Sequence, residues 1–399
     1  MGVSRRAFLK GGFALGAASA AGTALSACDN QPEHTTGDGA QEKAQLVGFD
    51  GPHQAGISTE AQTTLNLVGF NVLAQTDPTS IRNLLRLWTE DARALCSGRN
   101  PVGSLESELS ENPANMTITC GFGPRLFEIL GRDIPEILSP IPSFSKDQLD
   151  PTWGQTDLAL QICGDDAVTV AHATRHMIRS AVDYVAVEWI QQGFNEPAER
   201  GTPRNLFGLK DGTVNPRDQR DYDDVVWIDQ GPQWQRGGTV MVVRRIAMNL
   251  DTWEQLDRTS RETAFGRALD TGAPLSGTEE FDAPDFRATD ATGLPVIDPM
   301  SHMARATIPR GKPEQQIRRR AYNYDLPPTS QTLAGGQTSN SGLVFICFQK
   351  DHRKQFSPIQ QRLDEGDRIN QWITHIGSAL YFCPPGTQQG KYWGQELLG

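Results

Sequence analysis

The stretch from Arg204 to Pro216 carries one carboxylate, Asp211, between two glycines. Asp-Gly is turn chemistry, and glycine lets the backbone adopt conformations that other residues avoid. The residue before Pro216 is biased away from helix, so we predict that the stretch is irregular. An isolated Asp-Gly is most often a surface turn, but a carboxylate held next to a reaction centre can take up a proton and return it.

Two further groups could do chemistry. His302 lies in a long irregular segment, where regular secondary structure gives no reason for a histidine, and Arg318-Arg319-Arg320 follow in a chain of net charge -11. A neutral imidazole can bind a haem iron, and guanidinium groups can bind the haem propionates. An exposed loop histidine and a solvated arginine face are the ordinary alternatives. A haem would need parts of both kinds, but the residue types alone leave both readings open.

The other histidines and cysteines show no metal-site spacing. His172 and His176 are four residues apart on a predicted helix, but no acid is in register with them, so we expect a structural role. His352 and His375 lie near a turn and a strand entry, and we expect both to be ordinary. The 6 cysteines include no Cys-x-x-Cys pair, which excludes the usual zinc and covalent haem motifs. Most lie in apolar runs and are predicted to be buried thiols.

The elements that would position these residues recur in two similar halves. Hydrophobic patterns predict strands at 63–72, 116–120, 157–163 and 184–192, then at 238–248, 342–348 and 378–382. Helices are predicted after Asp77, after Asp165-Asp166, after Asp251 and over 357–372. One strand of the second half would lie hidden in a long insert, 269–333. Each half thus has the order of a ferredoxin-like unit. We predict an α+β protein of two halves, 56–217 and 218–399, with antiparallel sheets and outer helices.

The N-terminal residues 1–28 are predicted to be an export signal. Ser4 to Lys10 has the twin-arginine pattern, and the apolar run after it is too short to span a membrane convincingly. It ends in Leu25-Ser26-Ala27-Cys28, which is typical of a lipoprotein signal with a lipid on Cys28; cleavage after a small residue is the alternative. Residues 29–55 are polar and predicted to be a flexible tether. We expect a periplasmic or cell-surface protein that touches the membrane through that lipid alone, and the acidic charge argues against a nucleic-acid partner.

Gly208-Leu209-Lys210-Asp211-Gly212 resembles the Gly-x-x-Asp-Gly motif of the dye-decolourising (DyP-type) haem peroxidases. The resemblance continues through 238–245, the His302 region, the Arg-Arg-x-Tyr-x-Tyr segment at 319–324, 343–363 and Gly-Ser-Ala-Leu-Tyr at 377–381. It is strongest to the exported, iron-uptake-associated branch described as deferrochelatase/peroxidase. It implies a dimeric α+β barrel, meaning two ferredoxin-like halves, with one haem b in the second half.

The resemblance also implies roles for individual residues. His302 matches the proximal iron ligand, Asp211 the distal acid and Arg319 the distal arginine. Arg319 is preferred over Arg320 because the family arginine stands two residues before a small residue. That residue is alanine here, where glycine is usual, and this departure leaves open which arginine is the match. Contacts to the haem are implied for Gly212, Thr213, Val214, Ile308, Pro309, Arg310 and Arg319.

The implied reaction uses hydrogen peroxide to oxidise a reducing substrate, dye-like, phenol-like or related to iron, through a high-valent haem intermediate. The substrate would react in a small channel or at a surface aromatic residue, for which Trp372, Tyr381 and Trp393 are candidates. One alternative is a deferrochelatase that releases iron from haem and leaves the porphyrin intact. Others are a tethered haem-binding component of an iron importer and a chlorite-degrading relative. A homodimer is a further expectation.

Overall fold

The computed structural model describes residues 46–197 and 200–399, so the predicted export signal and most of the predicted tether lie outside the described residues. The first half contains β1 (Thr64–Val72), α1 (Pro78–Cys96), β2 (Thr117–Phe122), β3 (Leu158–Gly164), α3 (Ala167–Arg179) and β4 (Val185–Phe194). Asp77 and Asp166 cap the two long helices by accepting from Ser80 N and Thr169 N. The strands pair antiparallel in the order β2-β3-β1-β4. The predicted ferredoxin-like unit is confirmed here.

The second half has the same order of strands and helices, except that short helices replace the long helix of one crossover. It contains β5 (Thr239–Met248), β6 (Arg318–Arg319), β7 (Tyr322–Leu326), β8 (Asn340–Gln349), α9 (Phe356–Gly366) and β9 (Ile373–Cys383), with strand order β9-β5-β8-β7. The strand expected within the insert is β7. The helix predicted after Asp251 is wrong: the segment forms α5 (Leu250–Trp253) and α6 (Arg258–Phe265), because Asn249 and Asp257 each cap a separate short helix. The predicted helix 357–372 ends at Gly366 and continues as a 3-10 turn, η6 (Arg368–Gln371).

Short elements join these parts. They are η1 (Ser107–Leu109), α2 (Pro124–Ile129), η2 (Glu136–Leu138), η3 (Pro151–Trp153), α4 (Gln219–Val225), η5 (Gln233–Gln235), α7 (His302–Ala306), α8 (Ser330–Ala334) and α10 (Gln395–Leu398).

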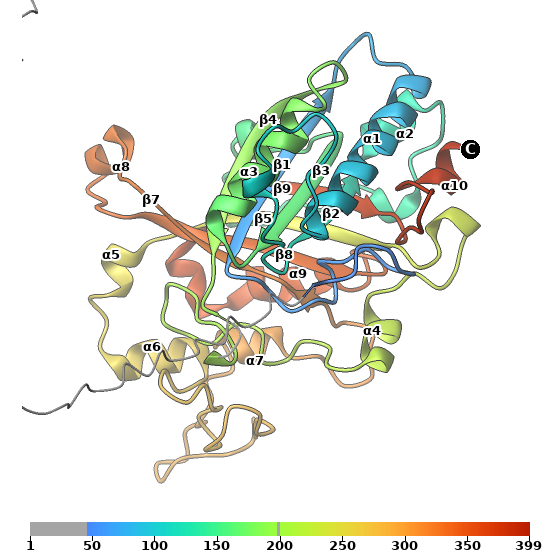
Figure 1. Ribbon diagram of the computed structural model, residues 1–399. Helices are drawn as coiled ribbons and strands as arrows, with labels where there is room; N and C mark the ends of the chain where they lie inside the picture. The colour runs from blue at the N-terminus through green and yellow to red at the C-terminus, as the bar shows by residue number, and fades with distance from the viewer. Residues whose placement is uncertain (1–45, 198–199) are drawn as a thin grey trace, which may run out of the picture. The chain divides into compact units, whose positions relative to one another are not determined.

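The two sheets join into one closed ring of strands (Figure 1). Phe122 of β2 pairs with Phe382 of β9, and Phe194 of β4 pairs with Asn323 of β7. Every strand of the ring therefore has two neighbours, and β6 is added beside β8. Inward-facing side chains such as Leu65, Met241 and Tyr381 fill the barrel. The predicted barrel is thus formed by the two halves of one chain.

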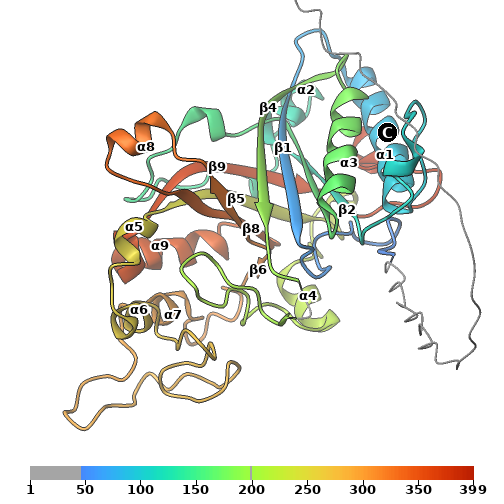
Figure 2. The ribbon, with the colours of Figure 1, turned by 60° about the vertical axis from the view of Figure 1, so that its left-hand side comes forward.

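The outer face of each half carries its helices (Figure 2). In the first half α1 and α3 pack directly on the strands, and Trp88 of α1 donates from Nε1 to Met177 O of α3 at 2.9 Å. The face of α3 that packs on the sheet includes Val170 and Met177, which are buried, whereas Val168 is 59% exposed. The burial of this face explains why its histidines are structural.

His176 has an acidic partner that the sequence pattern did not show. Its Nε2 lies 3.1 Å from Asp91 Oδ2 of α1, and both side chains are buried. No acid is in register with this histidine pair in the sequence, because the acid comes from a different helix. His172 Nε2 lies 3.2 Å from Ser110 Oγ. Both histidines are packed inside the first half, away from the cavity described below.

The predicted tether is too long at its C-terminal end. Residues 46–55 pack against the barrel, where Gln54 Nε2 donates to Cys120 O and Pro384 O and the His53 ring stacks on Trp227 at 3.7 Å. Their polar composition suggested a free chain, but the polar groups are used to satisfy backbone atoms at the barrel surface. The ordered half therefore begins before residue 56.

The described cysteines are buried free thiols, as predicted: Cys96, Cys120, Cys163, Cys347 and Cys383. Burial raises the pKa of the Cys96 thiol to about 12, so this thiol is protonated and unreactive at neutral pH. Within residues 46–197 and 200–399, no helix has the length and apolar character needed to cross a membrane.

Candidate active site

A cavity of about 540 Å³ lies against the outer face of the second half's sheet. Alternate residues of three strands form its floor: Arg244, Ile246 and Met248 of β5, Leu343 and Phe345 of β8, and Ile373 and His375 of β9. Residues of α9 and α7 and of the loops around 205–221 and 280–284 complete the wall. In the first half the long helix α1 covers the corresponding strand crossover, whereas here short helices and the insert leave space. The volume is typical of a ligand site, roughly 300–1,000 Å³.

Asp211 enters this cavity from a loop that we call the distal loop, residues 202–217. Arg204 and Lys210 form an isolated antiparallel bridge, and Gly208 closes the turn between them with a φ of 85°. Asn205 Oδ1 accepts from Phe207 N and Leu209 N, and the Phe207 ring packs 4.6 Å from Trp253. The loop is therefore anchored before it reaches Asp211.

Arg319 is the arginine that faces Asp211. Its Nη1 donates to Asp211 Oδ1 at 2.9 Å, and its backbone N–H and C=O both bond the Asn215 side chain at 2.9 Å. Side chains alternate between the two faces of a strand, so Arg318 and Arg320 point the other way. Arg320 is 2% exposed and donates to Thr59 O and Gln62 Oε1. Strand alternation thus selects Arg319 for the cavity.

His302 borders the same cavity from the first turn of α7. Ser301 caps this helix by accepting from Ala304 N, and the Phe265 ring lies 4.8 Å from the imidazole. His302 Nδ1 lies 2.5 Å from Asp367 Oδ2, a carboxylate that is 1% exposed. Because an ionised carboxylate accepts, Nδ1 carries the hydrogen and Nε2 is left as the nitrogen with a free lone pair. This is the arrangement of a metal-ligating histidine.

The rest of the cavity suits a flat apolar macrocycle that carries carboxylates. The walls are largely apolar, with Phe265, Ile317, Phe356, Ile359 and Leu363 among them. Arg244 and Arg267 also border it, and burial lowers the pKa of both guanidinium groups. A buried cation without a full set of partners is stabilised by a bound anion; Arg244 Nε is such an atom. The donor set of one imidazole, apolar walls and arginines therefore fits haem.

Several residues implied as haem contacts lie away from the cavity. Asp211, Thr213, Val214, Ile308 and Arg319 border it, whereas Gly212, Pro309 and Arg310 do not. Gly212 has a φ of 128°, and a Cβ there would lie 3.4 Å from Asn215 Nδ2. The positive φ accounts for glycine in the turn after Asp211. Arg310 is exposed at the surface.

Some cavity residues escaped the sequence analysis. His375 was expected to be ordinary, but it lies on the floor, where burial and the nearby Arg244 lower its pKa to about 3. Asp367 and Glu280 carry no motif, because Asp367 looks like a plain helix cap and Glu280 lies among other acids in the insert. The signal that could have found Asp367 is the general rule that a ligating histidine donates its second N–H to an acceptor.

Residues 54–195 match the family described as Dyp-type peroxidase, N-terminal, and residues 202–388 match Dyp-type peroxidase, C-terminal. The chain is 35% identical over 424 residues to the deferrochelatase of Escherichia coli K12, an alignment that covers 99% of this chain and 97% of that one. It is 33% identical over 430 residues to the dye-decolorizing peroxidase of Thermobifida fusca, with 100% and 97% covered.

Solved structures agree with these matches. The DyP-type peroxidase from Cellulomonas bogoriensis is 43% identical, with a TM-score of 0.85 over 89% of this chain and 99% of that chain. DtpA from Streptomyces lividans is 36% identical, with a TM-score of 0.84 over 90% and 98%. The two family matches together cover most of both halves of the chain. The chain belongs to the Dyp-type peroxidases, a family of haem-dependent enzymes.

Proposed function

We propose that this protein uses hydrogen peroxide to oxidise a small reducing substrate, with one haem b bound in the cavity and His302 as its iron ligand. The observation that carries the proposal is the Asp211–Arg319 ion pair at 2.9 Å, which borders the same cavity as the His302–Asp367 pair. When bound, the haem supplies the redox chemistry, since its iron exchanges electrons with peroxide and then with the reducing substrate.

Asp211 is the proton carrier of this proposal. Peroxide gives up a proton at one oxygen and needs one at the other before the O–O bond breaks. A single carboxylate can take the first proton at Oδ2 and return it to the far oxygen, because Oδ1 is occupied by Arg319 Nη1. Arg319 also holds the carboxylate in one orientation, and its remaining N–H groups can stabilise negative charge that develops on the oxygens. Asn215 fixes the arginine backbone in turn.

Asp367 serves the other end of the site. By accepting from His302 Nδ1 it fixes the tautomer and the ring orientation, so that Nε2 would be free to hold the iron. The carboxylate also makes the imidazole a more basic ligand. Its second oxygen accepts from Ile369 N at 3.0 Å, which holds the carboxylate against the end of α9.

Three substitutions test the proposal. His302→Ala should lose haem, seen as a lost Soret band, and full haem retention would refute the ligand assignment. Asp211→Asn and Arg319→Leu should keep haem but slow the Soret change that follows mixing with peroxide by about 10²–10⁴-fold, the usual contribution of a positioned acid–base group. Unchanged rates would remove both residues from the mechanism.

A second activity has support from the relatives named deferrochelatase. Iron release from haem with the porphyrin intact would use the same cavity. Anaerobic incubation of the haem-loaded protein without peroxide separates the two activities: fluorescent free protoporphyrin supports iron release, and its absence together with fast peroxide turnover supports the peroxidase. A role as a haem-binding component of an iron importer would fit slow turnover of both kinds.

The site of action is proposed from the sequence alone, because residues 1–45 lie outside the described part of the chain. Export by the twin-arginine route to the periplasm or cell surface, with a lipid on Cys28, is supported by the signal pattern at 4–28. Mass spectrometry of the mature N-terminus decides between the lipid and simple cleavage. Light scattering of the purified protein tests the expected homodimer.

A further inference from the structure

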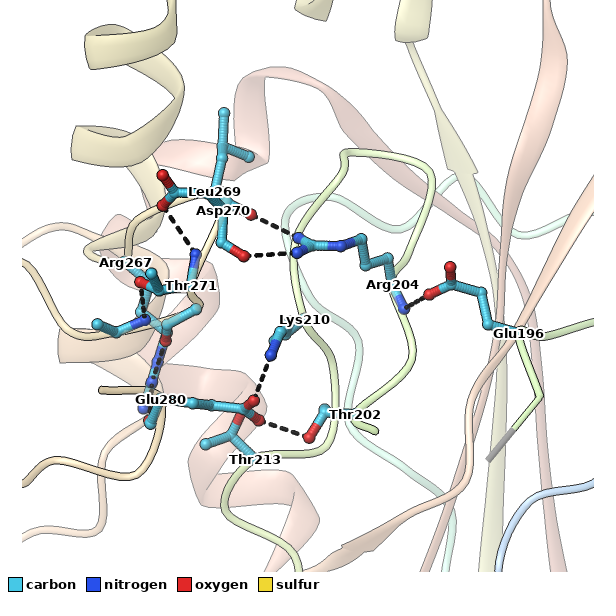
Figure 3. Close-up of polar contacts among 12 residues, drawn as sticks. Glu196, Thr202, Arg204, Lys210, Thr213, Arg267, Leu269, Asp270, Thr271 and Glu280 are labelled. Carbon is cyan, nitrogen blue, oxygen red and sulfur yellow. Dashed lines mark hydrogen bonds and ion pairs between the residues drawn. The ribbon is translucent and has the colours of Figure 1, made fainter. Parts of the chain in front are cut away.

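Glu280 lies at the contact between the distal loop and residues 266–285, which lead into the insert and form its first part (Figure 3). It is 9% exposed, although it is surrounded in sequence by exposed residues. Lys210 Nζ donates to its Oε2 at 2.6 Å, and Thr202 Oγ1 and Thr213 Oγ1 donate to its Oε1 at 2.5 and 3.0 Å. All three donors belong to the distal loop. Two of them, Lys210 and Thr213, flank Asp211.

Other bonds hold the same two segments together. Arg204 of the distal loop donates to Leu269 O and Asp270 O of the insert, and also to Gly208 O of its own loop. Arg267 donates to Gly272 O and to Glu280 O, so the backbone beside the Glu280 side chain is also fixed. These contacts make the insert a support for the distal loop.

The shape of the insert accommodates the Lys210 side chain. Gly272 has a φ of 76°, and a Cβ there would lie 2.7 Å from Lys210 Cδ. A side chain at position 272 would crowd the lysine stem where it passes this turn to reach Glu280, and the positive φ favours glycine there.

The Glu280 carboxylate is ionised in its buried position. Burial raises its pKa, but the hydrogen bonds from Lys210, Thr202 and Thr213 outweigh burial and hold the pKa below its usual value. A carboxylate that is buried and fully hydrogen-bonded fixes the groups around it, because moving any of them exposes an uncompensated charge. The residues on both sides of Asp211 are thus held by one charge that comes from another segment.

We propose that Glu280 is a positioning residue for Asp211: it fixes the distal loop so that the Asp211 carboxylate meets Arg319 and the peroxide. The proposal rests on the role of Asp211 under the proposed function. Glu280 acts through the backbone at 210–213 and takes no proton itself. Its loss should therefore slow the step that uses Asp211 and leave the later oxidation of the reducing substrate unchanged.

The test measures the rate constant for the Soret change on mixing with hydrogen peroxide, expressed per haem-loaded protein. Glu280→Ala removes all three acceptor contacts and should lower this rate constant about 10–100-fold, the effect expected of a small misplacement of a catalytic group. Glu280→Gln should partly restore it, because the amide oxygen can still accept from Lys210 while the amide N–H₂ donates to the threonine hydroxyls. Glu279→Ala, next to it and exposed, is the control and should match the wild type.

Two further measurements exclude a merely structural effect. The rate at which a phenolic donor, guaiacol, reacts with peroxide-treated protein should be the same in Glu280→Ala and wild type. In an Asp211→Asn background, Glu280→Ala should cause no additional slowing. An equal slowing in both backgrounds, or a rate within twofold of wild type for Glu280→Ala and Glu280→Gln, would overturn the proposal. If Asp211→Asn alone has wild-type rates, the proposed proton carrier fails instead, which is a different result.

Discussion

The substitution Asp367→Asn probes how the chain prepares His302 for iron. Asp367 uses both oxygens as acceptors, Oδ2 from His302 Nδ1 at 2.5 Å and Oδ1 from Ile369 N at 3.0 Å. Asparagine has one acceptor and one donor of the same shape. Whichever way the amide is turned, a donor must face a donor: the amide N–H₂ meets either the imidazole or the Ile369 N–H.

The cost follows from these contacts. A hydrogen bond to a charged group contributes about 1.5–3 kcal/mol and a neutral one about 0.5–1.5 kcal/mol, and the centres of these ranges differ by about 1 kcal/mol, which is lost at the imidazole. The group left without a partner at this buried position adds about 1 kcal/mol or more. A total of about 2 kcal/mol corresponds to roughly 30-fold weaker haem binding, since about 1.4 kcal/mol is tenfold.

The assay is a titration of apoprotein with ferric haem, followed by a redox titration of the loaded protein. The ferric state should lose most of the affinity, because the carboxylate stabilises the higher charge on the iron. Roughly 30-fold weaker ferric binding at unchanged ferrous binding raises the reduction potential by about 90 mV, at about 59 mV per tenfold for one electron. The weaker ferric binding and the higher reduction potential therefore both follow from the contact between Asp367 and His302.

Glu365→Gln is the matched control, because it also removes a carboxylate charge near α9. Glu365 is 56% exposed in its pair with Arg305 at 3.4 Å, and exposed pairs of this kind contribute little. For Asp367→Asn, a haem affinity within twofold of wild type and a reduction potential within about 10 mV of wild type would show that His302 does not depend on this acceptor.

Further predictions concern neighbouring residues. Arg320→Leu should lower the Tm, because it removes the buried donor to Thr59 O and Gln62. Arg319→Leu should keep the Tm and lose peroxide reactivity. The reverse outcome would contradict the strand register. His375 has a pKa of about 3 in the folded protein and about 6.5 in the unfolded chain. It therefore contributes stability above about pH 6.5, and this stability is lost as the pH falls toward 3. His375→Gln should flatten the fall of Tm between pH 6.5 and 4, and an unchanged slope would count against a buried neutral imidazole. Gly266→Ala should weaken haem binding, because Gly266 has a φ of 86° and a Cβ there would lie 2.8 Å from the Ser301 Oγ that caps the His302 helix; unchanged affinity in a haem titration would show that the cap tolerates the shift.

The parts of the fold that could be predicted are those with a local pattern. Alternating or continuous apolar runs over β1, β5 and β8 and capping aspartates before α1 and α3 are short-range signals, and the strands and helices are found there. The insert concealed β7 because its core, Tyr322 to Tyr324, is short and followed by polar residues. The ring closure could not be predicted from residue patterns, since each joint depends on one residue pair between the halves.

The candidate site, like the fold, could be predicted only in part. Asp211, His302 and the run Arg318–Arg320 were candidates by type and setting, and only the family resemblance selected Arg319. Strand alternation explains why Arg319 and not Arg320 reaches the cavity. Asp367 and Glu280 are separated by 65 and 70 residues from the groups that they hold. No local pattern reports such contacts, because one depends on how α7 packs on the end of α9 and the other on how residues 266–285 pack on the distal loop. The charge or apolar character of a residue alone did not distinguish these two acids from surface acids.

The order of the cavity residues along the chain has a consequence for synthesis. The first half is complete at Phe194, where β4 ends, and can form its sheet while translation continues. The cavity draws its residues from Asn205 to His375, and the ring needs β9 to join β5 with β2. At about 5–20 residues per second, the roughly 180 residues between these points take about 10–35 seconds to make. Haem can therefore be taken up only once nearly the whole chain has left the ribosome, and the first half must remain soluble with two unjoined edge strands until then.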